Sequence, residues 1–255
     1  MLSLDAPVIA VLWQAFVAQC FPSALRPAGR VVLGLTVWSI YLADRLFDVR
    51  RPAIGEESAR HDFYRRHSRI TIAILTIAAS ADCLITFVWL RPAVLHTGII
   101  VSVGVLLYLF VLHFGGTHLR IPKELVVAVL FSAGTFVVAW TSPSANHHEL
   151  LGAGASFALL CLANLVAIES WEFRELRRDL GARPHVLTRW LETAYLAWVP
   201  ALAVVCAAFG SRWYIAVAMS AAALAGIFAV GPRWSLEVRR VLVDAALLTP
   251  LLFLL

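Results

Sequence analysis

Residues 31–48 read VVLGLTVWSIYLADRLFD, an apolar run that ends in two aspartates with an arginine between them. If one helix continues through both acids, their four-residue spacing places Asp44 and Asp48 on the same helix face. Carboxylates at the end of a membrane segment are costly unless they hold a cation. This stretch therefore predicts a membrane helix whose end carries functional acid groups.

The composition of the chain is that of a membrane protein. Of its 255 residues 61% are hydrophobic, whereas soluble domains contain about 45–50%. The hydrophobic residues form charge-poor runs close to the ~20 residues that span a hydrocarbon core. We therefore predict an all-α polytopic integral membrane protein with about nine transmembrane helices, from the runs 6–25, 31–43, 70–90, 92–119, 125–148, 150–168, 193–211, 213–230 and 238–255.

Basic residues are distributed unevenly among the connections between these runs. Connections on the side of the N-terminus, counted together with Arg239 and Arg240 at the start of the last run, hold seventeen arginines and lysines, and those on the opposite side hold four. Because basic connections stay in the cytoplasm, the N-terminus and the acidic segments are predicted to be cytoplasmic, in an inner membrane of the bacterial type. The net charge of +5 then reflects topology and anion binding. Nucleic-acid binding would need a basic face on a soluble domain, which is not predicted here.

A second acidic segment, ELRRD at 175–179, follows the apolar run 150–168. It begins 131 residues after the first segment, 44–48, and it holds the same position relative to its helix. This spacing indicates a weak pseudo-repeat of four-helix units, a plan that builds central sites in membrane proteins. We expect a single transmembrane domain over residues 1–255.

The two acidic segments together suggest a Mg²⁺ site that binds a diphosphate. Mg²⁺ prefers oxygen ligands, and a diphosphate and water complete its shell between carboxylates. The candidate catalytic residues and metal ligands are Asp44, Asp48, Glu175 and Asp179. Arginine grips phosphate oxygens bidentately, so the substrate-binding candidates are the nearby polar and basic residues Arg45, Arg51, Arg120, Lys123, Arg178, Asn164, Tyr41 and Glu172. The alternative is that these charges pair with neighbouring arginines and only set topology.

Two further aspartates, Asp82 and Asp244, interrupt apolar runs. An ionisable residue within a membrane segment is by default a candidate for function, here as a base or proton acceptor. The alternative for each is a structural pair with an arginine or a helix hydroxyl.

Residues 43–48 resemble the first aspartate motif of the UbiA superfamily of intramembrane prenyltransferases. The segment 175–179 lies where the second DxxxD motif of that family belongs, and LRIPKELVV at 119–127 is similar to the basic turn that opens its fifth helix. The resemblance extends over the whole chain in topology and over these three segments in motif. It implies nine helices around a central cavity, with the acidic motifs holding Mg²⁺.

The resemblance implies a Mg²⁺-dependent enzyme that ionises a prenyl diphosphate and transfers the prenyl group to an aromatic or lipid acceptor. A terpene cyclase on the same scaffold and a non-catalytic membrane homologue remain alternatives. Ile40-Tyr41 replaces the Asn-Asp that usually precedes the first motif, and Glu175 replaces an aspartate. These departures indicate a divergent member. The prenyl chain length, the acceptor and the oligomeric state do not follow from the sequence.

Overall fold

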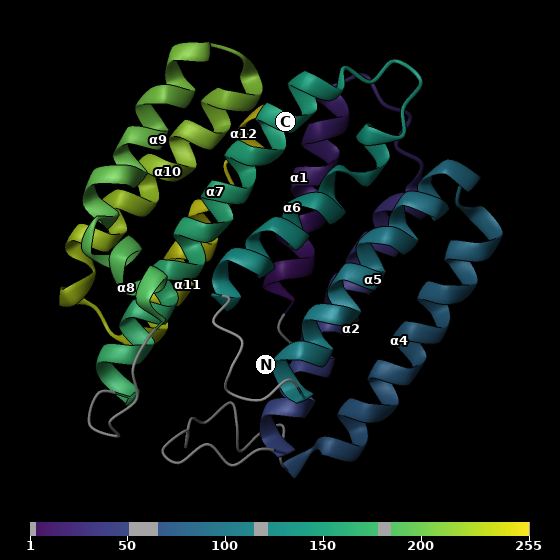
Figure 1. The fold of residues 1–255 in the computed structure, drawn as a ribbon, viewed down its shortest axis with the longest axis horizontal. Coiled ribbons are helices and arrows are strands. Elements are labelled where there is room, and N and C mark those ends of the chain that lie inside the picture. Colours follow the sequence, from purple (N-terminus) through teal and green to yellow (C-terminus); the bar gives the residue numbers. More distant parts are fainter. Residues whose placement is uncertain (1–3, 51–65, 115–121, 178–184, 255) are drawn as a thin grey trace.

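The computed structural model describes residues 4–50, 66–114, 122–177 and 185–254, and each regular element in these ranges is a helix. Figure 1 shows the elements as a bundle of long helices. In chain order they are α1 (Asp5–Cys20), α2 (Pro27–Arg50), α4 (Ser68–Trp89), α5 (Pro92–Phe114), α6 (Lys123–Trp140), α7 (His147–Glu172), the π turn η1 (Phe173–Arg177), α8 (Val186–Thr193), α9 (Tyr195–Phe209), α10 (Arg212–Val230), the 3₁₀ turn η3 (Gly231–Arg233), α11 (Leu236–Ala246) and α12 (Leu251–Leu254).

Proline and glycine mark several helix boundaries. Pro92 is the first residue of α5 and Pro122 immediately precedes α6, positions where a missing N–H costs no helix hydrogen bond. Gly210 follows α9 with a φ of 66°, the left-handed conformation that ends many helices and that glycine adopts without steric cost.

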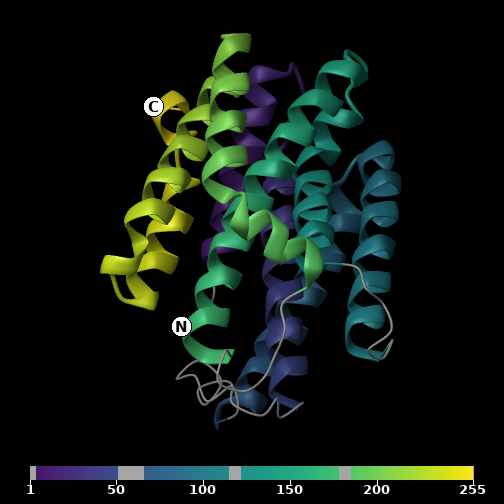
Figure 2. The ribbon, with the colours of Figure 1, turned by 60° about the vertical axis from the view of Figure 1, so that its left-hand side comes forward.

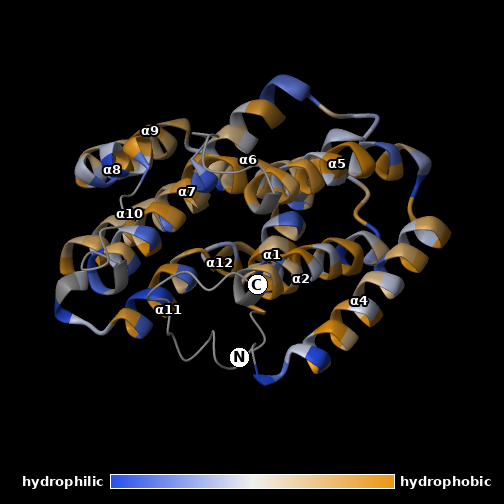
Figure 3. Cartoon of the chain, turned by 60° about the horizontal axis from the view of Figure 1, so that its bottom comes forward, coloured by the Kyte–Doolittle hydropathy of each residue, from blue (hydrophilic) through white to orange (hydrophobic). Residues whose placement is uncertain are grey.

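The long helices run alternately up and down, so that α2 and α7 terminate at the same end of the bundle (Figures 1 and 2). The two acidic segments belong to these helix ends: Asp44 lies in the last part of α2, and Glu175 lies in η1 directly after α7. We call this part of the molecule the acidic end. Viewed from there, the helix bodies are mainly hydrophobic and hydrophilic residues gather near the helix ends (Figure 3).

The main core surrounds α7 and joins it to α1, α6, α9, α10 and α11. Trp13, Phe157 and Trp213 are fully or almost fully buried and contact one another. A buried indole needs an acceptor for its N–H. That of Trp13 donates to the Leu247 carbonyl oxygen (2.9 Å) and that of Trp213 to Ser156 Oγ (3.1 Å).

Five described helices are long and apolar enough to cross a membrane, and a sixth span results if α8 and α9 count as one bent segment. On the peripheral helices α4 and α5 large apolar side chains face outward; Phe87 is 70% exposed and Leu106 is 64% exposed. The protein is thus an α-helical protein built to be embedded in a membrane. This span count does not confirm the nine spans around a central cavity that we predicted.

Two predicted helix boundaries need correction. The run 125–148 is interrupted, because α6 ends at Trp140, a turn that includes Ser142 follows, and α7 begins at His147. The last run, 238–255, is not one helix either. A turn separates α11 from α12, where Thr249 Oγ1 donates to the Ala216 carbonyl oxygen (3.1 Å), and the following Pro250 has no N–H to continue a helix. By contrast, α2 does continue through Asp44 and Asp48, as predicted.

Candidate functional site

The last turns of α7 carry three acidic side chains in succession, Glu169, Glu172 and Glu175. The helix continues beyond the predicted apolar run as far as Glu172, and the π turn η1 then holds Glu175. Side chains three residues apart lie on neighbouring parts of one helix surface, and π turns often occur at functional sites. We call these three residues the acidic row.

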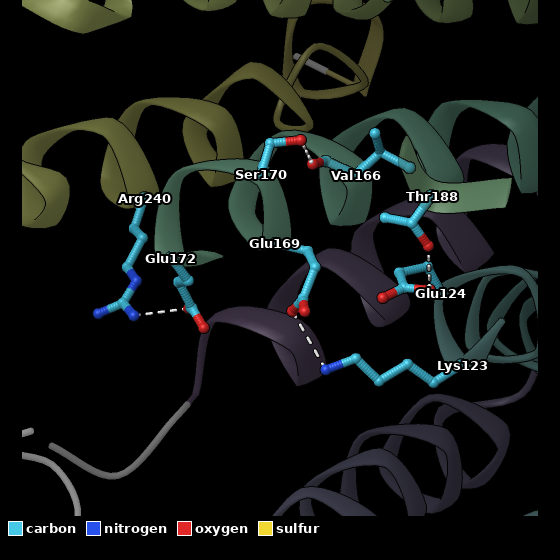
Figure 4. Close-up of polar contacts among 8 residues, drawn as sticks. All are labelled: Lys123, Glu124, Val166, Glu169, Ser170, Glu172, Thr188 and Arg240. Carbon is cyan, nitrogen blue, oxygen red and sulfur yellow. Dashed lines mark hydrogen bonds and ion pairs between the residues drawn. The ribbon is translucent and has the colours of Figure 1, made fainter. Parts of the chain in front are cut away.

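Each member of the acidic row is paired with a cation from another helix, and Figure 4 shows the pairs of Glu169 and Glu172. The three pairs are Lys123 Nζ–Glu169 Oε2 at 3.1 Å, Arg240 Nη2–Glu172 Oε1 at 2.5 Å, and Arg239–Glu175. Lys123 is the first residue of α6, whereas the two arginines are consecutive residues of α11. The acidic row thus connects α7 with α6, its neighbour in the chain, and with α11, which is distant in the chain.

Helix α8 adds two further polar contacts at this end. Thr188 Oγ1 donates to Glu124 Oε2 (3.0 Å), and both residues are buried. Arg174 Nη2 lies 2.5 Å from Glu192 Oε1. These contacts fix α8 against the start of α6 and the end of α7.

Arg239 and Arg240 are buried although they carry full charges. Their side chains are 7% and 10% exposed, and residues of this type are almost never so buried unless they are paired. The Arg239 guanidinium lies 5.3 Å from the ring centre of Trp171, a favourable cation–π arrangement.

The guanidinium groups of these two arginines are not fully satisfied. Within the described part of the chain, Nε of Arg239 and Nε of Arg240 are buried without a hydrogen-bond partner. A buried donor without an acceptor costs free energy, and each case asks for an explanation such as an unseen ligand or water. The pair therefore has hydrogen-bonding capacity left for an anion.

A second polar group lies farther inside the bundle. Asn164 Nδ2 of α7 donates to Asp244 Oδ1 of α11 (3.3 Å), and Asn164 is buried. Asp244 also lies within electrostatic range of Tyr41 on α2. The structure therefore places one predicted substrate-binding residue, Asn164, in contact with an aspartate that interrupts an apolar run.

The first acidic segment is described only in part. Asp44 and Arg45 are half-buried on α2, and the Arg45 guanidinium lies 5.9 Å from the ring centre of Tyr41. The helix includes Asp48, but its side chain lies outside the described set, as do the residues Arg51, Arg120, Arg178 and Asp179.

The predicted metal site remains a prediction. Among the described residues, no group of three or more His, Cys, Asp or Glu side chains could hold a metal ion. The side chains of two of the four predicted ligands, Asp48 and Asp179, lie outside the described set. Of the other predicted residues, Lys123, Glu172 and Glu175 gather at the acidic end.

Sequence reasoning missed Arg239 and Arg240 as candidate residues. The count of basic residues treats both as signals of topology, because basic residues near the ends of apolar runs usually mark the cytoplasmic side. The available signal was their position inside the run 238–255, a few residues before Asp244. Charges placed within an apolar run point to burial and pairing rather than to a solvated connection.

Comparison with known proteins leaves the family open: no family model, no curated protein and no solved structure matches the chain.

Proposed function

We propose that this chain is a Mg²⁺-dependent intramembrane prenyltransferase of the UbiA type, which ionises a prenyl diphosphate and transfers the prenyl group to an acceptor. The observation that carries the proposal is that two acidic helix ends, those of α2 and α7, lie at the same end of the bundle. There the buried arginines Arg239 and Arg240 and the α6 lysine Lys123 lie among the carboxylates. This combination suits a substrate with a highly charged head and an apolar tail.

The acid residues at this end have the donor chemistry for Mg²⁺. Asp44 and Glu175 offer carboxylate oxygens, the ligand type that this ion prefers, and Asp48 and Asp179 are the further candidates. When bound, the ion would neutralise charge on the diphosphate and favour its departure.

The arginines of α11 would hold the diphosphate itself. Arg239 pairs with Glu175, and its unsatisfied Nε is buried beside that pair. A diphosphate oxygen can take the place of the Glu175 carboxylate on the guanidinium, because arginine binds phosphate in the same bidentate manner. Glu175 is then released for the metal, so substrate and metal binding support each other. Arg240 remains on Glu172 and keeps α11 against α7.

The interior polar group gives the proposed reaction a place for the displaced proton. The carboxylate of Asp244, held by Asn164, would accept a proton when the new bond forms, as a general base. In this proposal nine membrane segments enclose the cavity, and the acidic end faces the cytoplasm of a bacterial-type inner membrane. Tyr41, which stands where the family has an Asp, would line the same cavity in this proposal.

The test is pyrophosphate release by purified full-length protein in detergent, from geranyl, farnesyl and geranylgeranyl diphosphates, with and without an aromatic acceptor. Release should require Mg²⁺ and should fall by about 100-fold or more in Asp44→Asn and Glu175→Gln, because each removes charge stabilisation from the leaving group. Glu149→Gln, in the first turn of α7 at the opposite end, is the matched control and should retain activity. Thermal unfolding of each variant separates lost chemistry from lost folding.

The products of the same reactions separate the related functions. Release that depends on the acceptor, with a prenylated product, supports a transferase. Cyclic hydrocarbons formed without an acceptor would instead establish a terpene cyclase. Absence of release from folded protein under all these conditions would overturn the enzymatic proposal.

A further inference from the structure

Helix α8 is short and lies across the direction of the helix that follows it. It spans Val186–Thr193, and its axis is bent by 71° from that of α9. Large apolar side chains of α9 face outward, including Val204 at 70% exposure and Phe209 at 66%, as expected for a helix in lipid. If α9 runs along the membrane normal, α8 lies within about 20° of the membrane plane.

The contacts of α8 place it at the depth where the apolar spans begin. Thr188 donates its hydroxyl proton to Glu124, the second residue of the candidate span α6. The Trp198 indole of α9 donates to the Leu191 carbonyl oxygen (3.0 Å). Helix α8 is therefore held at the level of the first turn of α6, while α7 continues past this level with its charged residues.

The residues of α8 divide into two different faces. The inner face contacts the protein through Thr188, Leu191 and Glu192. The outer face carries apolar side chains at i, i+1 and i+4: Val186 at 61% exposure, Leu187 at 37% and Trp190 at 70%. Between the two faces Arg189 is exposed. A helix with exposed apolar residues on one side is unstable in water unless that side is covered.

We propose that α8 is an interfacial helix, seated in the boundary between lipid headgroups and acyl chains through Val186, Leu187 and Trp190. Tryptophan is enriched at this depth because its ring is amphipathic. Arg189 lies beside the apolar face and meets the lipid phosphates. This inference is independent of the proposed enzymatic activity.

Lipid fits this surface better than a protein partner does. The apolar face of α8 leads directly into the exposed apolar side of α9, beginning with Leu196 at 53% exposure. One lipid boundary therefore covers both helices. A stable protein interface buries roughly 800 Å² on each partner, which three side chains of one short helix do not provide.

Spin-label depth measurements test the proposal. Full-length protein with its four cysteines replaced by alanine receives a single cysteine, labelled with a nitroxide, at position 190. It is reconstituted in vesicles of phosphatidylethanolamine and phosphatidylglycerol. Accessibility to oxygen and to a water-soluble nickel chelate gives the label depth. Labels at Val204 on α9 and at Ser144, which is exposed in the connection between α6 and α7, provide the lipid and water references.

The proposal predicts a depth between the two references, about 5–10 Å below the headgroup boundary. Chelate accessibility equal to that at position 144 would overturn it, and so would a label shielded from both reagents, which would indicate a protein partner or a second copy. If the cysteine-free protein fails to fold, brominated lipids replace the label. They should quench wild-type fluorescence more than that of Trp190→Phe. Equal fractional quenching would contradict the proposal.

Discussion

The most apolar stretches of helices α7 and α4 have the same mean hydropathy, yet the two helices occupy opposite environments in the molecule. Within the candidate span of α7, 56% of the residues are buried, whereas in α4 the share is 11%. The first helix is surrounded by protein, and the second faces the surroundings along most of its length. Hydropathy therefore identifies a membrane helix but does not tell whether its neighbours are helices or lipid.

The difference extends to the polar residues of the two helices. The acidic row at the end of α7 meets a cation at each position. On α4, Asp82 Oδ2 accepts one hydrogen bond from Thr36 (2.7 Å), and Oδ1 is buried without a hydrogen-bond partner among the described residues. The comparison indicates that charge on the central helix holds the bundle together, while the carboxylate on the peripheral helix contributes little to stability.

The largest loss of stability is expected when an ion pair of the central helix α7 is removed. Arg240→Ala leaves Glu172 without its cation in a site where the glutamate is only 21% exposed. Removing one partner of such a pair should lower the free energy of unfolding by about 2–3 kcal/mol. Thermal unfolding in detergent measures the change, with Arg233→Ala at an exposed position as the control. A loss of stability no larger than that of the control would show that the ion pair between Arg240 and Glu172 does not stabilise the bundle.

A smaller loss is expected from Gly231→Ala, which tests how closely Arg239 and Trp171 pack. An added Cβ would lie 3.1 Å from Trp171 Cζ2 and 3.3 Å from Arg239 Cδ. Overpacking of this kind should cost about 1–2 kcal/mol. Gly226→Ala is the matched control, since its Cβ meets nothing within 4 Å and alanine favours a helix by about 1 kcal/mol. Equal stability of the two variants would contradict the close packing.

The smallest effects are expected on α4. Thr36→Val removes the hydrogen bond to Asp82 and should cost about 0.6 kcal/mol, the average for such bonds in membranes. Asp82→Asn keeps an acceptor and removes a poorly satisfied carboxylate, so stability should stay the same or rise slightly. The same unfolding measurement applies. A loss as large as that of Arg240→Ala would show that the contrast between the two helices is false.

The positions of most helices could be predicted from the apolar runs, because a chain segment in a membrane must form a helix to satisfy its own backbone N–H and C=O groups. The sequence also predicted that α2 continues through Asp44 and Asp48. The break after Ala246 was missed although Pro250 signals it in the sequence. The contact that accompanies the break, between Trp13 and Leu247, joins residues 234 apart and could not be predicted. Buried ion pairs escape prediction for the same reason: a pattern of charges does not show which helices meet.

For the candidate site, the sequence located the acidic segments but not their partners. Lys123 and Glu172 were predicted as substrate-binding residues and Glu175 as a catalytic residue and metal ligand, and the structure places the three at one end. Arg239 was not predicted, because its role depends on burial against Trp171. The π turn that carries Glu175 also has no clear sequence signal, since it depends on how the end of α7 packs.

Calorimetric binding of a non-reactive farnesyl thiolodiphosphate to the full-length protein, with and without Mg²⁺, tests the central claim most directly. The proposed site predicts binding that requires Mg²⁺ and is lost in both Asp44→Asn and Glu175→Gln, but not in Glu149→Gln. Binding that is independent of Mg²⁺, or that survives the Asp44 substitution unchanged, would show that the two acidic segments do not form one diphosphate site.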